Sequence, residues 1–208
     1  MATTQKLTPV AQRAKRLSII FLTLMVLGSV GLDQATKVHA QEALMRWQDE
    51  TDLSLYQGQR YPIFALGSPY ADDGSKLYLS LSMNYVRNLG AAWGALSGLA
   101  DNIRVPFFYM VTCLAVVIIF IYMRSMPVNH RLSIFSLSLI LSGAVGNFID
   151  RVRLGYVIDW IDVRWNLIGW RYDFPNFNVA DSAITVGVSF LMFEMLVLDT
   201  LRKRAGTA

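Results

Sequence analysis

The sequence predicts an all-α membrane protein in which four transmembrane helices carry a small extracytoplasmic β-sheet and a short interfacial helix. Hydrophobic residues make up 54% of the 208 residues and charged residues only 16%, whereas soluble domains average about 25% charged residues. The apolar residues are concentrated in four long runs, and the basic residues gather near the ends of these runs. We therefore expect residues 1–208 to form a single integral membrane domain.

The four apolar runs have the length of membrane spans, because a helix of about 20 apolar residues crosses the hydrocarbon layer. The predicted spans cover about residues 17–37, 104–123, 131–149 and 180–200. The first run could instead belong to a cleaved signal peptide whose small-residue motif V-H-A ends at Ala40. Asp33 and Lys37 lie between the run and this motif, so an uncleaved first span is the preferred interpretation.

The long loop formed by residues 38–103 carries the predicted elements outside the membrane. Leu77 to Tyr85 partly alternates between apolar and polar residues, as a half-buried strand does. A partner strand is expected within residues 53–66. Asn88 to Asn102 is rich in Gly and Ala and too short for a span, so a short helix at the membrane interface is expected there.

The distribution of basic residues orients the chain, because Lys and Arg near span ends remain in the cytoplasm. They cluster before the first span, between the second and third spans, and after the fourth span, at Arg13, Lys15, Arg16, Arg124, Arg131, Arg202, Lys203 and Arg204. Both termini are therefore expected in the cytoplasm. The loops at residues 38–103 and 150–179 are expected on the outer side of the membrane.

Composition and motif content argue against several classes of function. The net charge of +4 is not arranged as a basic stripe with interleaved aromatic residues, so no nucleic-acid partner is predicted. His39 and His130 lie far apart, and no H-E-x-x-H motif is present, so no metal site and no cofactor are predicted. A transporter would show repeated halves or broken spans, and no repeat is visible. The remaining alternative is a non-enzymatic membrane protein whose polar residues only cap and pack helices.

The segment from Gly146 to Asp181 concentrates carboxylates beside the third and fourth spans. Ionisable groups near a membrane are costly, which makes them functional candidates. Asp159 lies in the apolar sequence V-I-D-W after the third span, and Asp181 opens the fourth. Two adjacent carboxyl groups share one proton. The ionised group could then activate a water, while the protonated group polarises a peptide carbonyl. This pattern indicates peptide hydrolysis without a metal.

A structural interpretation of the same two aspartates is equally open. Asp181 would cap the fourth helix, which is the usual role of Asp at a helix start, and Asp159 would pair with an arginine. Asp162 lies three residues after Asp159. If this segment is extended, side chains three residues apart point to opposite faces, so only one of the two can face Asp181.

Further polar residues around the two aspartates are candidates for substrate binding or support, namely Asn88, Gly90, Asn147, Arg151, Asn178, Asp33 and Lys37. Asn147 and Arg151 share a helix face at a spacing of four residues, although helix capping and surface ion pairs explain them more simply. Asn88 with Gly90 could equally form a turn. Asp33 and Lys37 are spaced for an ordinary ion pair between residues i and i+4.

Five motifs of this chain resemble the lipoprotein signal peptidase (signal peptidase II) family in sequence and in order. They are D-Q-A-T-K at 33–37, N-L-G-A-A-W-G at 88–94, G-N-F-I-D-R at 146–151, G-Y-V-I-D-W at 155–160 and F-N-V-A-D at 177–181. The resemblance implies that Asp159 and Asp181 are the catalytic pair. It also implies supporting roles for Asn147, Arg151 and Asn178, with Asn88 beside the substrate.

The same resemblance implies an aspartic endopeptidase of the bacterial inner membrane, with several spans and its active site at the outer surface. Its substrates would be diacylglyceryl-modified prolipoproteins, which are cut before the lipidated cysteine. Membrane lipids would surround it, and cyclic peptide antibiotics such as globomycin would inhibit it. A lipid anchor holds the scissile bond at the membrane surface, where carboxylates at the ends of spans can reach it.

Three features depart from the pattern of the family. The loop at residues 38–83 is longer than expected, and residues 160–177 contain extra residues in W-N-L-I-G-W-R-Y-D. Trp93 and Trp160 stand where Phe is more usual. These departures concern the shape of the loops and the substrate preference rather than the two aspartates.

Overall fold

The computed structural model describes residues 9–45, 60–67, 77–91, 94–125, 130–167, 170–198 and 206, with side chains from residue 20 onward. Trp93 and residues 46–59 and 68–76 of the long 38–83 loop lie outside the described residues. The helices are α1 (Pro9–Met45), α2 (Asp101–Ser125), α3 (Arg131–Leu154), α4 (Val179–Phe193) and the π-helical turn η3 (Glu194–Leu198). The strands are β1 (Tyr61–Leu66), β2 (Tyr78–Asn88), β3 (Val157–Leu167) and β4 (Trp170–Asp173).

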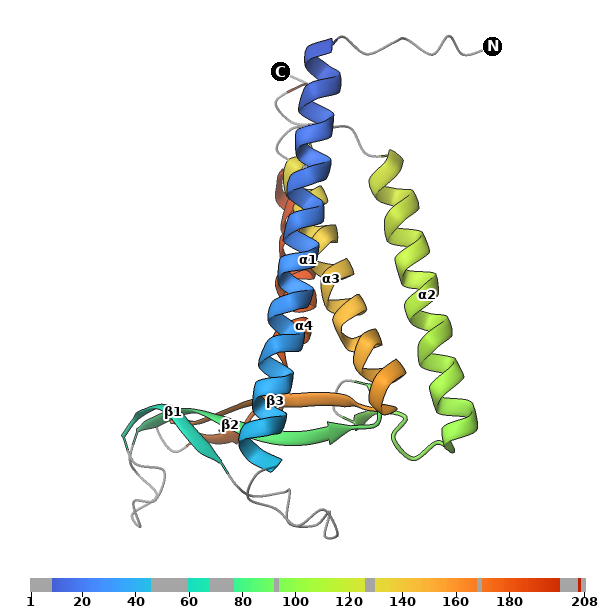
Figure 1. Ribbon diagram of the computed structural model, residues 1–208. Helices are drawn as coiled ribbons and strands as arrows, with labels where there is room; N and C mark the ends of the chain where they lie inside the picture. Colours follow the sequence, from blue (N-terminus) through green and yellow to red (C-terminus); the bar gives the residue numbers. More distant parts are fainter. Residues whose placement is uncertain are drawn as a thin grey trace.

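The helices rise from one side of a thin sheet, and only the C-terminal end of α1 passes beyond it (Figure 1). Helix α3 packs against α1, α2 and α4, whereas α2 packs mainly against α3. In the described part of the chain, three helices are long and apolar enough to cross a membrane, namely Asp101–Met123, Arg131–Leu154 and Val179–Leu198. They lie where the second, third and fourth spans are predicted, and the first predicted span lies within α1.

The prediction of an all-α class is corrected by a four-stranded antiparallel sheet in the order β1-β2-β3-β4. Strand β2 lies where the alternating pattern predicts a strand, and β1 lies within residues 53–66, where its partner strand is expected. Strands β3 and β4 lie in the segment between α3 and α4, including the extra residues of the 160–177 segment. The stretch I-D-V-R-W-N-L from Ile161 alternates apolar and polar residues, which is a strand signal. The membrane protein is therefore a mixed structure of helices and a small sheet.

The predicted interfacial helix over Asn88–Asn102 is not an α-helix in the described residues. The segment forms successive tight turns. In each turn the N–H group of Gly94, Ser97 or Leu99 donates to the carbonyl oxygen three residues earlier. Gly94 and Leu96 have positive φ angles of 69° and 67°, and such angles interrupt a right-handed helix. Asp101 already belongs to α2. The small residues of this stretch thus allow a tight loop rather than a helix.

Small residues on α3 allow the backbones of neighbouring helices to approach closely. A Cβ atom at Gly143 would overlap the carbonyl oxygen of Ala180 in α4. A Cβ atom at Gly146 would lie 2.6 Å from a carboxylate oxygen of Asp33 in α1. These contacts place α3 where its polar residues can reach both α1 and the start of α4.

The variant Gly143→Ala should destabilise the protein by about 1–3 kcal/mol, because the added methyl group forces α3 and α4 apart. Gly28→Ala is the matched control, since nothing lies within 4 Å of a Cβ atom at that helical position. The midpoints of thermal unfolding in detergent would measure both effects. Equal midpoints for the two variants would contradict the close packing of α3 on α4.

Candidate active site

Asp159 and Asp181 meet where β3 passes the N-terminus of α4. Asp159 is the third residue of β3 and is 3% exposed. Asn178 links the two aspartates, because its side-chain nitrogen donates to Asp159 Oδ1 at 2.8 Å and its side-chain oxygen accepts the Asp181 N–H at 2.9 Å. One amide thus contacts residues that lie 22 positions apart in sequence.

The local sequence places each aspartate at the end of a regular element. Helix α3 ends at Gly155, whose φ of 79° turns the chain into β3. Asn178 is the N-cap of α4, and Asp181 is the third residue of a capping box in which its carboxylate accepts the Asn178 N–H at 3.2 Å. The proposed cap at Asp181 is therefore corrected: Asn178 caps the helix, and Asp181 completes the reciprocal pair.

Further amides bind the two carboxyl groups. Asn147 in α3 donates to Asp181 Oδ1 at 2.7 Å, and Asn88 at the end of β2 donates to Asp159 Oδ2 at 2.9 Å. The alternative in which Asp159 pairs with an arginine does not hold, because its hydrogen-bond partners among the described residues are Asn88 and Asn178. Neutral amides orient a carboxyl group without neutralising it, so either aspartate can still carry or release a proton.

Burial raises the pKa of Asp159 to about 7, and the negative charge of nearby Asp181 acts in the same direction. The hydrogen bonds from Asn88 and Asn178 and the charge of Lys37 lower the pKa but do not cancel the effect of burial. A carboxyl group with this pKa is about half protonated at neutral pH. The site can therefore hold one proton near pH 7.

Arg151 supports the loop beside Asp159 instead of binding a carboxylate. Its guanidinium donates to the carbonyl oxygen of Gly90 at 3.0 Å and lies 4.4 Å from the centre of the Phe108 ring. The Gly90 N–H in turn donates to the side-chain oxygen of Asn88 at 2.9 Å. The expected turn at Asn88 and Gly90 is confirmed, and the same Asn88 side chain also reaches Asp159.

Lys37 lies at the centre of a buried ionic cluster next to the two aspartates, formed by Asp33, Lys37 and Asp150. Its ammonium lies 2.9 Å from carboxylate oxygens of both Asp33 and Asp150, and it donates to the Asn147 side chain at 2.9 Å. The side chains of Lys37 and Asp33 are each 1% exposed. The ion pair between Asp33 and Lys37 is confirmed, but it is fully buried and includes Asp150 as a third member.

The ionic cluster also binds the backbone next to each aspartate. Asp33 accepts the N–H of Ala180 at 2.9 Å, and Asp150 accepts the N–H of Ile158 at 3.1 Å. Ala180 precedes Asp181, and Ile158 precedes Asp159. Asp150, for which a surface ion pair was the simpler interpretation, was not among the site residues predicted from the sequence. Its spacing of three residues from Asn147 on α3 was the available signal, because such residues share a helix face.

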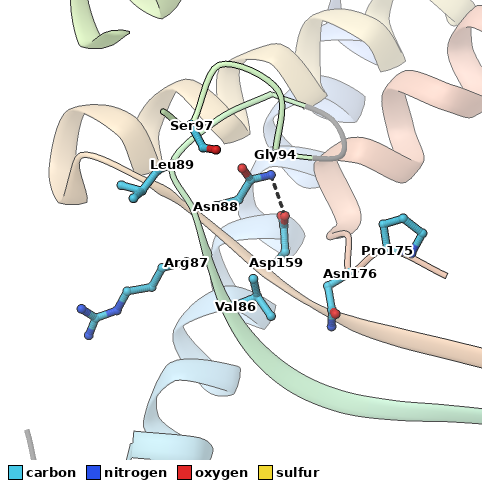
Figure 2. Close-up of a pocket in the computed structure, with 9 residues that line it drawn as sticks. All are labelled: Val86, Arg87, Asn88, Leu89, Gly94, Ser97, Asp159, Pro175 and Asn176. Atoms are coloured by element: carbon cyan, nitrogen blue, oxygen red, sulfur yellow. Dashed lines mark hydrogen bonds between the residues drawn. The ribbon is translucent and has the colours of Figure 1, made fainter. Parts of the chain in front are cut away.

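A cavity of about 310 Å³ opens beside Asp159 (Figure 2). It is lined by Val86, Arg87, Asn88, Leu89, Gly94, Ser97, Asp159, Pro175 and Asn176. Figure 2 shows Asn88 and Asp159 joined across one wall, with the turn at Gly94 and Ser97 above them. The lining by Arg87, Ser97 and Asn176 was not predicted, because these residues belong to three separate segments.

Asp162 lies outside this site, as the alternation of side chains along a strand predicts. Its carboxylate accepts from Arg60 at 2.8 Å and lies 3.3 Å from Arg164. Burial raises the pKa of Asp162, and the charge of Arg60 opposes that shift. Among the residues described, no group of three or more His, Cys, Asp or Glu side chains is arranged to hold a metal ion.

Comparisons with known proteins identify the family of this chain. The model of the family described as signal peptidase (SPase) II matches residues 24–197. A lipoprotein signal peptidase of Geobacter sulfurreducens is 42% identical, over 83% of this chain and 89% of the relative. A lipoprotein signal peptidase of Anaeromyxobacter sp. is 39% identical, over 86% of this chain and 83% of the relative.

A solved structure supports the same relationship. A bacterial membrane enzyme determined by the in meso method at 2.3 Å resolution superimposes with a TM-score of 0.61 and 30% sequence identity. The superposition covers 86% of this chain and 88% of that chain. The matched segment includes both aspartates, the buried ionic cluster and all of the described strands. The chain belongs to the signal peptidase II family of peptidases.

Proposed function

We propose that this protein is a membrane-embedded aspartic endopeptidase that removes signal peptides from diacylglyceryl-modified prolipoproteins. Membership of the signal peptidase II family supports the class of substrate. The observation that carries the aspartic mechanism is the amide of Asn178, which contacts both Asp159 and Asp181. The backbone N–H of the same residue donates to the Asp181 carboxylate. Asp159 lines the cavity, and Asp181 lies at the start of α4, a helix long enough to cross a membrane.

In this mechanism Asp181 is the general base and Asp159 is the general acid. Hydrogen bonds from Asn147 and from the Asn178 backbone stabilise the carboxylate of Asp181. With a pKa of about 7, Asp159 is protonated in about half of the molecules at neutral pH. The protonated carboxyl group donates a hydrogen bond to the scissile carbonyl. Asp181 takes a proton from a water molecule as the water oxygen attacks the carbonyl carbon. Asp181 then passes that proton to the leaving amine when the C–N bond breaks.

Peptide binding is assigned to the cavity and to the Asn88–Gly90 turn that Arg151 holds in place. A bound prolipoprotein would lie with its lipid anchor in the bilayer, and it would be cut before the lipidated cysteine. Cyclic peptide antibiotics such as globomycin would compete for the same cavity. The buried Asp33, Lys37 and Asp150 keep the segments next to the two aspartates in place.

We further assign the protein to the bacterial inner membrane, with α1 as a fourth span, both termini in the cytoplasm and the active site at the outer surface. The apolar run at the start of α1 and the basic residues near the span ends support this arrangement. We also propose that residues 1–208 form a single membrane domain, and the packing of α3 against each of the other three helices supports this.

The variant Asn88→Ala should move the alkaline limb of kcat/KM to higher pH. Its hydrogen bond lowers the pKa of Asp159, so removal raises that pKa above about 7. The proton required on Asp159 is lost as pH rises through the pKa, so activity falls later in the variant than in the unmodified protein. Profiles between about pH 5 and pH 9 would show the shift. Ser97→Ala, which alters the same cavity, should leave the limb in place.

The function is tested with purified protein and two synthetic precursor peptides that differ only in the diacylglyceryl group. The lipid-modified peptide should be cut before its cysteine, and the unmodified peptide should remain intact. Cleavage should persist in EDTA, because the proposed mechanism uses carboxyl groups and water. Equal cleavage of both peptides would refute the proposed substrate class, and loss of activity in EDTA that zinc restores would refute the mechanism.

A further inference from the structure

The four-stranded sheet has two chemically different faces. The register aligns Leu66, Leu79, Trp165 and Tyr172 in one row across all four strands. Residues paired directly across antiparallel strands lie on the same face, so this row belongs to one apolar face. Trp170, which is paired with Leu167 in the β3–β4 hairpin, lies on that face as well.

The opposite face is polar. The neighbouring row across the same four strands consists of Ala65, Ser80, Arg164 and Asp173. Arg164 and Asp173 approach each other to 3.9 Å within this row. In these two rows the alternation along each strand places bulky apolar residues on one face and mostly polar residues on the other.

Exposure is the reverse of what a water-soluble sheet shows. On the apolar face, Leu66 is 58% exposed and Trp170 is 80% exposed. On the polar face, Ser80 and Ser82 in β2 are only 8% and 7% exposed, whereas the Asp173 side chain in β4 is 50% exposed. A contiguous exposed apolar surface rimmed by polar groups marks a site of interaction. Something apolar outside the described chain must cover this face.

The position of Asp159 shows which way the apolar face points. Asp159 and Trp165 are six residues apart on β3, and side chains an even number apart lie on the same face. Asp159 faces Asn178 at the start of α4. The apolar face is therefore the side from which α4 rises, and the sheet extends sideways beyond the helices on that side (Figure 1). A bilayer crossed by these helices would lie directly against it.

We infer that the apolar face of the sheet rests in the interface of the lipid bilayer, with the β3–β4 hairpin as its outer anchor. The face is continuous with helices of membrane-spanning length, and Trp and Tyr are the residues that favour the membrane interface. Arg171, on the polar face of the hairpin, is exposed toward water. The occupant that this surface fits is a lipid surface, not a soluble protein.

The anchored sheet also sets the depth of the active site. Strand β3 carries Asp159 near its first end and Trp165 and Leu167 near its last. A strand rises about 3.3 Å per residue, so the anchor lies roughly 20–25 Å from Asp159 along a stiff, four-stranded element. The lipid interface would thus hold Asp159 at the level of a lipid-anchored peptide bond. Only this consequence rests on the proposed function.

Spin labels on the two faces of the hairpin test the inference in lipid vesicles. The single cysteine Cys113 is replaced by Ser, and nitroxides are attached at Trp170→Cys and Tyr172→Cys on the apolar face. Arg171→Cys and Asp173→Cys on the polar face are the matched controls. In phosphatidylcholine–phosphatidylglycerol vesicles, the apolar-face labels should collide mainly with oxygen, which concentrates in the bilayer. The control labels should collide mainly with a water-soluble nickel chelate.

Three results would overturn the inference. Nickel accessibility on both faces would place the hairpin in water. Spin–spin broadening at the apolar-face labels would show that a second copy covers this face. Protection from both reagents would show that another part of the chain covers it. These readouts do not depend on catalysis, so they remain informative if the proposed peptidase activity fails.

A kinetic comparison tests the effect of the anchor on depth. Trp170→Glu should lower cleavage of a vesicle-bound lipidated precursor severalfold, while cleavage of the same peptide in detergent is unchanged. Arg171→Glu, one residue away on the polar face, should leave both rates unchanged. An equal loss in vesicles and detergent, or no loss in vesicles, would contradict the role of the hairpin in setting the depth of the site.

Discussion

Replacing either Asp159 or Asp181 by Asn should reduce cleavage by at least about a thousandfold, as expected for residues that act as one catalytic unit. Asn has nearly the same shape as Asp but can neither take nor release a proton at neutral pH. At position 181 the Asn side-chain oxygen can still accept the Asn178 N–H, so the capping box at the start of α4 is retained. Each variant does lose one accepted hydrogen bond, because both oxygens of either carboxyl group accept from an N–H donor. The thermal midpoint separates this structural cost from the catalytic loss.

The matched control is Asp162→Asn, because Asp162 lies on the same strand but binds Arg60 and Arg164 outside the site. Precursor processing would be measured in vesicles at equal amounts of inserted protein, together with the thermal midpoint of each variant. Asp162→Asn should retain most of its activity. An active Asp159→Asn enzyme, or an inactive but well-inserted Asp162→Asn enzyme, would contradict the assignment of the pair.

The variant Lys37→Met should destabilise the protein by about 3–5 kcal/mol, because removing one partner leaves buried charges uncompensated. Lys37 contacts both Asp33 and Asp150 at 2.9 Å. Met has a similar length, so the loss of charge dominates over the loss of volume. The same change should lower activity, since Asp33 and Asp150 bind the backbone next to Asp181 and Asp159.

Chemical unfolding in detergent would measure this effect, with Thr36→Ala as the control one residue away on the exposed side of α1. Thr36 bonds only carbonyl groups of its own helix, so its loss should be small. Adding Asp150→Asn to Lys37→Met should recover part of the stability, because the two residues are directly coupled. Equal stability of Lys37→Met and Thr36→Ala would show that the buried cluster contributes little.

The sequence by itself determined the helical membrane scaffold and the identity of the two candidate aspartates. Apolar runs of span length identify helices because a bilayer leaves the backbone no other partners than its own. The alternation of apolar and polar residues around Leu77–Tyr85 predicted β2, because successive side chains of a strand point to opposite faces. Because a strand points side chains three residues apart to opposite faces, only one of Asp159 and Asp162 could face Asp181, and the resemblance to the family selected Asp159.

Only the tertiary structure decided which residues meet. Lys37 and Asn147 are in contact across 110 positions of sequence, and no local pattern encodes such a pair. Arg151, a candidate for substrate or carboxylate binding, instead holds the Gly90 carbonyl through a contact between α3 and a distant loop. Asp150 belongs to a residue type that usually lies at the protein surface, but it is only 1% exposed.

The sheet shows the same division most clearly. Each strand carries its alternation in sequence, but the apolar row from Leu66 to Tyr172 exists only when the register of all four strands is known. The side of the sheet on which this row lies is known from Asn178, which binds Asp159 at the start of α4. Periodicity is a property of one segment, whereas register and facing are set by contacts between segments. For this reason the sequence predicted the elements and the catalytic candidates, and the fold alone assigned the surface and the supporting network.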